Sequence, residues 1–205
     1  MSGLPFAVQR GTPADAPKGK IPFIRDGDVV LGDSVFILEH LKSAHGVDLD
    51  AHLTADQRAL GWALERMLED HLYFAILHAR WAIDENFEKG PAQFFAAAAE
   101  DVKRTRKAGM MQTLHGQGMG RHTETEIAEL AGKDFAAAAT LLGNKPFLFG
   151  ERPSSMDATL FAFTGSAASP TFHTKIRAAA EAHANLVAHQ WRFMDAYYPD
   201  FEEVA

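Results

Sequence analysis

Two short features in residues 18–34 have chemistry that suits a small peptide ligand. A proline follows Ile21 at the start of an extended segment, and because proline cannot donate to a sheet ladder, Pro22 belongs at a strand start or edge. If this peptide bond is cis, the neighbouring backbone turns outward and can pair with an extended peptide. Asp33 and Ser34 then begin a helix, whose free N–H groups favour a carboxylate. The residues alone leave two interpretations, a peptide-carboxylate site or an ordinary turn and helix cap.

The ten histidines of the chain raise the question of a metal site. His71 and His78 share a predicted helix face, but two helical turns separate them by roughly 10 Å, which is too far for one ion. His40 and His45 are not at the spacing of a helical ligand pair, and the sequence has no H-E-x-x-H motif. We therefore expect no metal site.

Two further clusters have structural interpretations. The alternating glycines of HGQGMG, residues 115–120, lack the preceding strand and the spacing of a phosphate-binding loop, so they predict a break between two helices. The basic run KRTRK, residues 103–107, predicts a solvated helix face. The alternative interpretation of this basic run is that its positive charge attracts an anionic ligand.

The elements that position these residues differ along the chain. Residues before 46 predict a strand at Leu4–Arg10 and a hairpin at Ile21–Leu31 whose tight turn is Asp26-Gly27, followed by the helix that starts at Asp33. From Thr54 onward apolar residues recur every three or four positions, which predicts helices at about 54–75, 91–114, 123–142, 155–168 and within 172–198. Capping-box pairs are expected at Thr54/Gln57 and Ser154/Asp157.

Composition narrows the class of protein. The 205 residues are 47% hydrophobic and 23% charged, which suits a folded globular chain. No apolar run is long enough for a membrane helix, and the N-terminus lacks the pattern of a signal peptide. The absence of cysteine excludes a disulfide scaffold, and the net charge of −7 argues against a general nucleic-acid binder. We expect a soluble, cytoplasmic protein with no nucleic-acid partner and no membrane segment.

Several of these segments resemble the glutathione S-transferase superfamily. The strand-opening proline at Lys20-Ile21-Pro22, the acidic turn at 26–28 and the Asp33-Ser34 helix start match the glutathione-binding pattern of that family. The segment FLFGERPSSMDATLF, residues 147–161, is similar to its helix-capping motif. KGKIPFI, RMLEDHLYFA and HANLVAHQWRFMDAYYPDF look like the branch related to metaxins and failed-axon-connections proteins.

The resemblance implies an α+β, mostly α fold, with a thioredoxin-like region at 1–46 and an all-helical glutathione S-transferase C-terminal-type domain at 54–205. It also implies that glutathione is the substrate, without a metal, and that the protein is a homodimer. The implied glutathione-binding residues are Lys20, Ile21, Pro22, Asp33 and Ser34.

The resemblance also suggests roles in the helical domain. Ser154 and Asp157 would be structural, as the cap of a core helix. The pocket for a small electrophile would involve Trp62 and Tyr73, for which ordinary helix packing is the alternative.

One departure from the family concerns catalysis. The family places a strand and a helix before the segment matched by Leu4–Arg10, and the Tyr, Ser or Cys that stabilises the glutathione thiolate follows that strand. The chain shows neither, so no catalytic residue is predicted and the sheet edge would be open. Three explanations compete: the natural protein begins upstream, it is a short relative that binds without catalysis, or Ser2 or Thr12 has taken the role. The sequence thus supports a glutathione transferase, with a non-catalytic metaxin-like interaction module as the alternative.

Overall fold

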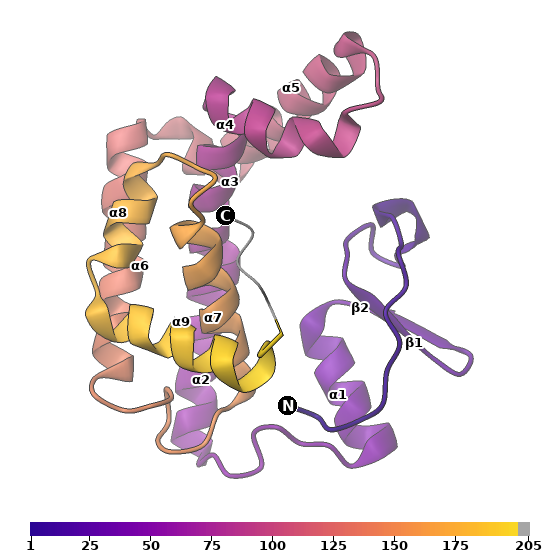
Figure 1. Cartoon of the computed structure of the whole chain (residues 1–205), viewed down its shortest axis with the longest axis vertical. Helices are drawn as coiled ribbons and strands as arrows, with labels where there is room; N and C mark the ends of the chain where they lie inside the picture. Colours follow the sequence, from indigo (N-terminus) through magenta and orange to yellow (C-terminus); the bar gives the residue numbers. More distant parts are fainter. Residues whose placement is uncertain (201–205) are drawn as a thin grey trace. The chain divides into compact units, whose positions relative to one another are not determined.

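The computed structural model describes residues 1–200 and divides the chain into two compact units, Met1–His52 and Leu53–Ala205 (Figure 1). The last five residues of the predicted helical domain, including the end of the metaxin-like segment, lie outside the described residues.

Unit 1 contains the predicted hairpin and helix. Strands β1 (Phe23–Asp26) and β2 (Val29–Gly32) pair antiparallel, with Phe23 opposite Gly32, and Gly27 supplies the positive φ of +58° that the tight turn requires. Helix α1 (Ser34–His45) follows β2 directly. It ends at Gly46, whose left-handed backbone lets its N–H bond the carbonyls of Leu41 and Lys42.

The predicted strand at Leu4–Arg10 is wrong. The sheet formed by the described residues has two strands, β1 and β2, and residues 4–10 pair with neither. Phe6 and Val8 are 85% and 86% exposed, although the local pattern favoured a strand. A strand is stable only against a partner, which a local pattern cannot supply. A short 3₁₀ turn at Pro13–Asp15 is the first regular element.

Unit 2 is helical. A π-helical turn at Leu68–Leu72 joins the first two helices, and 3₁₀ turns occupy Pro91–Phe95 and Met119–Arg121. The predicted helix at about 91–114 begins later, at Glu100, because the Gly90-Pro91 pair starts a tighter turn. The helices of unit 2 are α2 (Ala55–Met67), α3 (Tyr73–Trp81), α4 (Asp84–Lys89), α5 (Glu100–Gln117), α6 (Glu124–Leu142), α7 (Ser155–Ala168), α8 (Lys175–Glu181) and α9 (Ala184–Tyr197).

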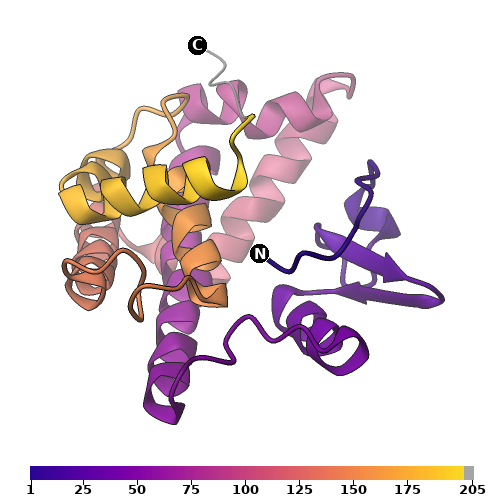
Figure 2. The ribbon, with the colours of Figure 1, turned by 60° about the horizontal axis from the view of Figure 1, so that its bottom comes forward.

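The hydrophobic core lies in unit 2. Leu68, Leu72, Phe135 and Leu160 are fully buried within one cluster that runs through α2, α3, α6, α7, α8 and α9. Helices α6 and α8 lie side by side, and α9 packs across α7 (Figure 2). The predicted class, a small α/β region followed by an all-helical domain, is confirmed.

The lengths and compositions of the helices test whether any of them could span a membrane. No helix among the described residues combines the length and the apolar character needed to cross a bilayer.

Candidate functional site

The candidate ligand site is the junction between the start of β1 and the start of α1. The Ile21–Pro22 bond is cis and lies one residue before β1. Ile21 is 55% exposed and Lys20 is exposed, so this stretch of chain is at the surface of unit 1.

Asp33 has an unusual backbone. Its φ of +83° is the single positive value at a non-glycine residue within residues 1–200, a conformation that costs about 1–3 kcal/mol. The residue is the N-cap of α1, and its Oδ1 accepts a hydrogen bond of 3.1 Å from the backbone N–H of Val35. Ser34 follows as the first helical residue and is exposed. Strained residues cluster at functional sites, so this helix start is a strong candidate.

Lys18 belongs to the same junction, and sequence reasoning missed it. Its Nζ lies 3.9 Å from Asp33 Oδ2 and 3.8 Å from the centre of the Phe36 ring. Both partners of the ion pair are about half exposed, so the pair itself adds little stability. The KGK motif carried a signal for Lys18, but only Lys20 directly precedes the Ile21-Pro22 pair. The junction thus combines a helix N-terminus, a carboxylate and an ammonium group, which can hold both ends of a zwitterionic peptide.

The two aromatic candidates in unit 2 have packing partners. Trp62 is 54% exposed and stacks on the Arg66 guanidinium at 4.7 Å. The Tyr73 ring meets Phe74 and Phe163 edge to face at 5.2 and 6.5 Å. Neither aromatic lines the open depression of about 370 Å³ between α2, the end of α6 and residues 145–149. Tyr73 therefore packs against aromatic neighbours within unit 2, whereas Trp62 is exposed and contacts Arg66 on its own helix.

Ser154 and Asp157 form a fully buried capping box at the start of α7. Asp157 Oδ2 accepts hydrogen bonds from the Ser154 N–H at 2.8 Å and the Ser154 hydroxyl at 2.7 Å. Its Oδ1 accepts from the Leu148 N–H at 2.8 Å and from His189 Nε2 at 3.0 Å. Four donors therefore converge on one carboxylate, and two of them come from outside α7.

The charge of Asp157 is maintained inside the protein. Burial raises the pKa of this carboxyl, but the hydrogen bonds from His189, Leu148 and Ser154 lower it more, and the net pKa is below the usual value. The carboxylate is therefore ionised at neutral pH. It ties the 148 loop and α9 to the start of α7 and contacts no open cavity, which suits a structural role.

A second buried carboxylate was not foreseen from the sequence. Asp134 on α6 is 7% exposed and pairs with His71, whose Nδ1 lies 2.6 Å from Asp134 Oδ2. Burial raises the pKa of Asp134, and the hydrogen bond from His71 offsets part of that rise. The residues are 63 positions apart, so no local spacing could have indicated the pair.

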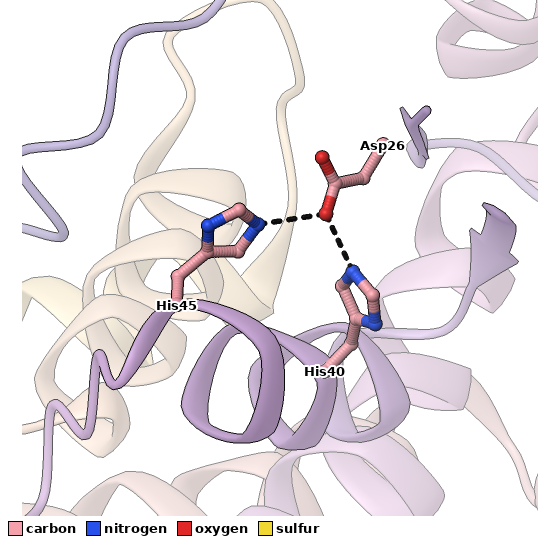
Figure 3. A group of neighbouring side chains, drawn as sticks. All are labelled: Asp26, His40 and His45. Carbon is pink, nitrogen blue, oxygen red and sulfur yellow. Dashed lines mark hydrogen bonds and ion pairs between the residues drawn. The ribbon is translucent and has the colours of Figure 1, made fainter. Parts of the chain in front are cut away.

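The histidines of α1 meet a third residue (Figure 3). His40 Nε2 and His45 Nε2 each lie 2.7 Å from the same oxygen, Asp26 Oδ2, at the end of β1. These hydrogen bonds, His40 first and His45 second, hold the pKa of the Asp26 carboxyl below its usual value. Sequence reasoning weighed the two histidines as a pair and missed the aspartate. The acidic DGD turn was the available signal.

The basic run on α5 is engaged in ordinary surface contacts. Lys103 pairs with Glu100 at 2.6 Å, and Lys107 pairs with Asp84 while lying over the Phe87 ring. These pairs support the solvated helix face predicted for residues 103–107. The glycine-rich segment that follows forms the end of α5 and a 3₁₀ turn, as expected for a break between helices.

Comparison with known families matches both parts of the chain. Residues 1–87 match the model of the glutathione S-transferase N-terminal domain. Residues 131–193 match the model of the glutathione S-transferase C-terminal domain. The N-terminal match extends beyond unit 1 through α2 and α3.

Curated relatives fall into two groups. The isoprene-epoxide–glutathione S-transferase of Rhodococcus sp. is 38% identical over 155 residues, which cover 72% of this chain and 65% of that protein. Failed axon connections of Drosophila melanogaster is 29% identical over 203 residues, which cover 91% of this chain and 49% of that protein. Metaxin-1 of Mus musculus is 25% identical over 219 residues, which cover 99% of this chain and 68% of that protein. The chain thus spans about half to two thirds of the length of these relatives.

Proposed function

Because the chain belongs to the glutathione S-transferase superfamily, within the branch that also contains metaxins and failed axon connections, we propose that it binds glutathione at the junction of β1 and α1. In this proposal residues 1–46 are the glutathione-binding region and residues 54–205 the helical domain. The protein is a cytoplasmic homodimer that adds glutathione, through its thiolate, to a small electrophile.

The observation that carries the proposal is the backbone of Asp33. A positive φ at a residue other than glycine persists only where its surroundings enforce it, and here it sets a carboxylate at the start of a 12-residue helix. Asp33 and Ser34 would hold the γ-glutamyl end of glutathione, with the Asp33 carboxylate on the ligand ammonium and helix N–H groups on its carboxylate. The backbone of Ile21, beside Pro22, would pair with the cysteinyl part.

The ammonium groups of the KGK motif would bind the other end of the ligand. Lys20 would reach the glycyl carboxylate, as the resemblance implies. Lys18 lies near Asp33 and can contribute a second positive charge. The half-exposed Lys18–Asp33 pair gives up little when a ligand carboxylate competes for the ammonium.

The class of electrophile follows from the Rhodococcus relative, whose name specifies an epoxide. In such a reaction the glutathione thiolate attacks an epoxide carbon, the carbon–oxygen bond opens and the oxygen takes up a proton. No residue of this chain is assigned as the group that stabilises the thiolate. Ser154 and Asp157 remain structural in this proposal, and Trp62 and Tyr73 are not given a substrate role.

The test is calorimetric titration of the full chain with glutathione. Wild type is expected to bind, and Ser34→Ala and Asp33→Asn are each expected to weaken binding at least tenfold. Ser43→Ala, an exposed serine on the same helix, is the matched control and should leave binding unchanged. Consumption of thiol with a small epoxide then tests the transfer step. Binding that ignores Ser34→Ala would refute the site.

A non-catalytic interaction module is the second candidate. The relatives include metaxins and failed axon connections, whose names specify no enzyme, and Phe6 and Val8 are exposed in the segment before the first turn. Such side chains can seat a protein partner. A Phe6→Ser/Val8→Ser variant would then lose the partner while glutathione titration shows no heat in any variant.

A further inference from the structure

The cluster of Asp26, His40 and His45 has the composition of a metal site. Both imidazoles present Nε2 to one carboxylate oxygen at 2.7 Å, and the three donor atoms all lie within 4.8 Å of one another (Figure 3). Two imidazole nitrogens and one carboxylate oxygen are the donors that Zn²⁺ accepts when its fourth position is left to water. An ion bound here would replace the two hydrogen bonds that the imidazole Nε2 atoms make to Asp26 Oδ2.

The local elements explain how residues so far apart in sequence converge. His40 and His45 lie five positions apart on α1, a spacing that by itself spreads two side chains around the helix. Asp26 is the last residue of β1, and its carboxylate lies between the two imidazole rings. The planes of these rings make an angle of 77°, and their centroids are 6.0 Å apart. The hairpin therefore completes a donor set that α1 alone cannot make.

The adjustment needed to hold an ion is small. Zinc–ligand bonds of about 2.0–2.1 Å place tetrahedral donors about 3.4 Å apart. Each Nε2–Oδ2 distance of 2.7 Å would lengthen by less than 1 Å, a change on the order of a side-chain rotation. The two Nε2 atoms, which now lie at most 4.8 Å apart, would come to the same separation of about 3.4 Å. The side chains of Asp26, His40 and His45 are 38%, 17% and 36% exposed, which leaves room for such rotation and for a water ligand.

The surroundings favour a cation. His45 is the last residue of α1, where the negative end of the helix dipole lies. Lys42 on the same helix is neutralised by Asp48, whose Oδ2 lies 2.7 Å from Lys42 Nζ. The carboxylate of Asp26 faces the imidazoles of His40 and His45.

An ion at this place would supply what unit 1 lacks. The hydrophobic core cluster contains no residue of unit 1, and Ala16 is the single hydrophobic side chain classed as buried within residues 1–52. Helix α1 has no buried residue. Small structural units without a core are commonly held by a metal or a disulfide, and the chain has no cysteine.

We propose that Asp26, His40 and His45 bind one Zn²⁺ ion that clips the β1–β2 hairpin to the end of α1. The proposed glutathione site lies at the N-terminal end of α1, where Ser34 is roughly 9 Å from His40 and roughly 17 Å from His45 along the helix axis. The ion is therefore a structural clip within unit 1 and takes no part in the proposed glutathione chemistry.

Calorimetric titration with ZnCl₂ tests the clip on the untagged full chain, after treatment with EDTA and removal of the chelator. Wild type is expected to bind one equivalent more than the His40→Gln/His45→Gln variant. His45→Gln and Asp26→Asn are each expected to raise the dissociation constant at least tenfold. His122→Gln is the control, because His122 is also an exposed histidine near a carboxylate, 4.0 Å from Glu126, and it should bind zinc like wild type.

A second readout separates metal binding from loss of structure. Zinc should slow hydrogen exchange of the β1 and β2 amides in wild type and leave that exchange unchanged in His45→Gln. His45 is exposed and is the last residue of α1. His45→Gln should therefore keep the fold even where the His40→Gln/His45→Gln double variant unfolds. Equal stoichiometry and affinity in wild type and His45→Gln, or exchange that zinc does not alter, would overturn the proposal and leave a hydrogen-bonded cluster.

Discussion

Replacement of Asp157 by asparagine isolates the value of a buried charge at a helix start. Asparagine has the same shape but one acceptor oxygen, so two of the four donors that converge on Asp157 lose their acceptor. A hydrogen bond to a charged group contributes about 1.5–3 kcal/mol, and the Ser154 hydroxyl can turn to accept from the new amide. We expect Asp157→Asn to lower the free energy of unfolding by about 3 kcal/mol.

The matched control is Glu126→Gln in the capping box of α6. Glu126 Oε2 also accepts from the backbone N–H and hydroxyl of its N-cap, Thr123, at 2.8 and 2.9 Å, but the pair is exposed. Water replaces the lost contact there, so the expected cost is about 0.5 kcal/mol or less. For a chain of this size the two changes correspond to a melting temperature lowered by about 6–12 °C and by at most about 2 °C.

Urea unfolding followed by far-UV circular dichroism measures both variants. Equal losses in Asp157→Asn and Glu126→Gln would refute the reasoning, because they would show that burial of the carboxylate adds nothing to its hydrogen bonds. A loss below about 1 kcal/mol for Asp157→Asn alone would do the same.

The same variant has a pH signature. The pKa of Asp157 is lower in the folded chain than its ordinary value, so the unfolded chain takes up the proton first as pH falls. The stability from this carboxylate is therefore complete above the ordinary pKa of about 3.9 and is lost as pH falls through the folded value. The gap between wild type and Asp157→Asn should narrow from pH 5 toward pH 2.5. Parallel stability curves would contradict the assignment.

Further substitutions at four positions test the packing of unit 2 by the same unfolding assay. Leu68→Ala removes a fully buried side chain from the core and should cost about 3–5 kcal/mol. Gly120→Ala places a methyl group 2.8 Å from the backbone of Leu114 and should cost about 1–3 kcal/mol, whereas Gly109→Ala, in open space on α5, should gain about 0.5–1 kcal/mol. Thr54→Ala removes the exposed cap of α2 and should cost about 1 kcal/mol, a loss that Thr54→Ser restores.

Features encoded by neighbouring residues were predictable from the sequence. The hairpin turn at Asp26-Gly27, the start of α1 after Asp33 and the capping box at Thr54 all depend on contacts within about four positions, and the structure has each of them. The family resemblance rested on such local motifs as well, and the comparisons bear it out.

Features that depend on distant pairing were not predictable. Leu4–Arg10 has the alternation of a strand, but the described residues offer it no partner. Asp134 meets His71 across two helices, and Asp26 reaches His40 and His45 only because a hairpin returns the chain to α1. The spacing of residues in the sequence predicts which side chains share a face of one helix or strand. It does not predict which side chains from different elements are brought together by tertiary folding.

The confinement of the hydrophobic core to unit 2 has a consequence for the motions of the chain. Amides of α6 and α7, whose side chains enter that core, should exchange with solvent only when the whole helical unit unfolds. The hairpin and α1 bury little apolar surface, so they should open far more often, in excursions that leave the helical unit intact. Helix α1, where both ligands proposed above would bind, thus lies on the part of the chain that opens first. Ligand concentration would then set how often this segment is closed, and with it how long the chain survives a protease.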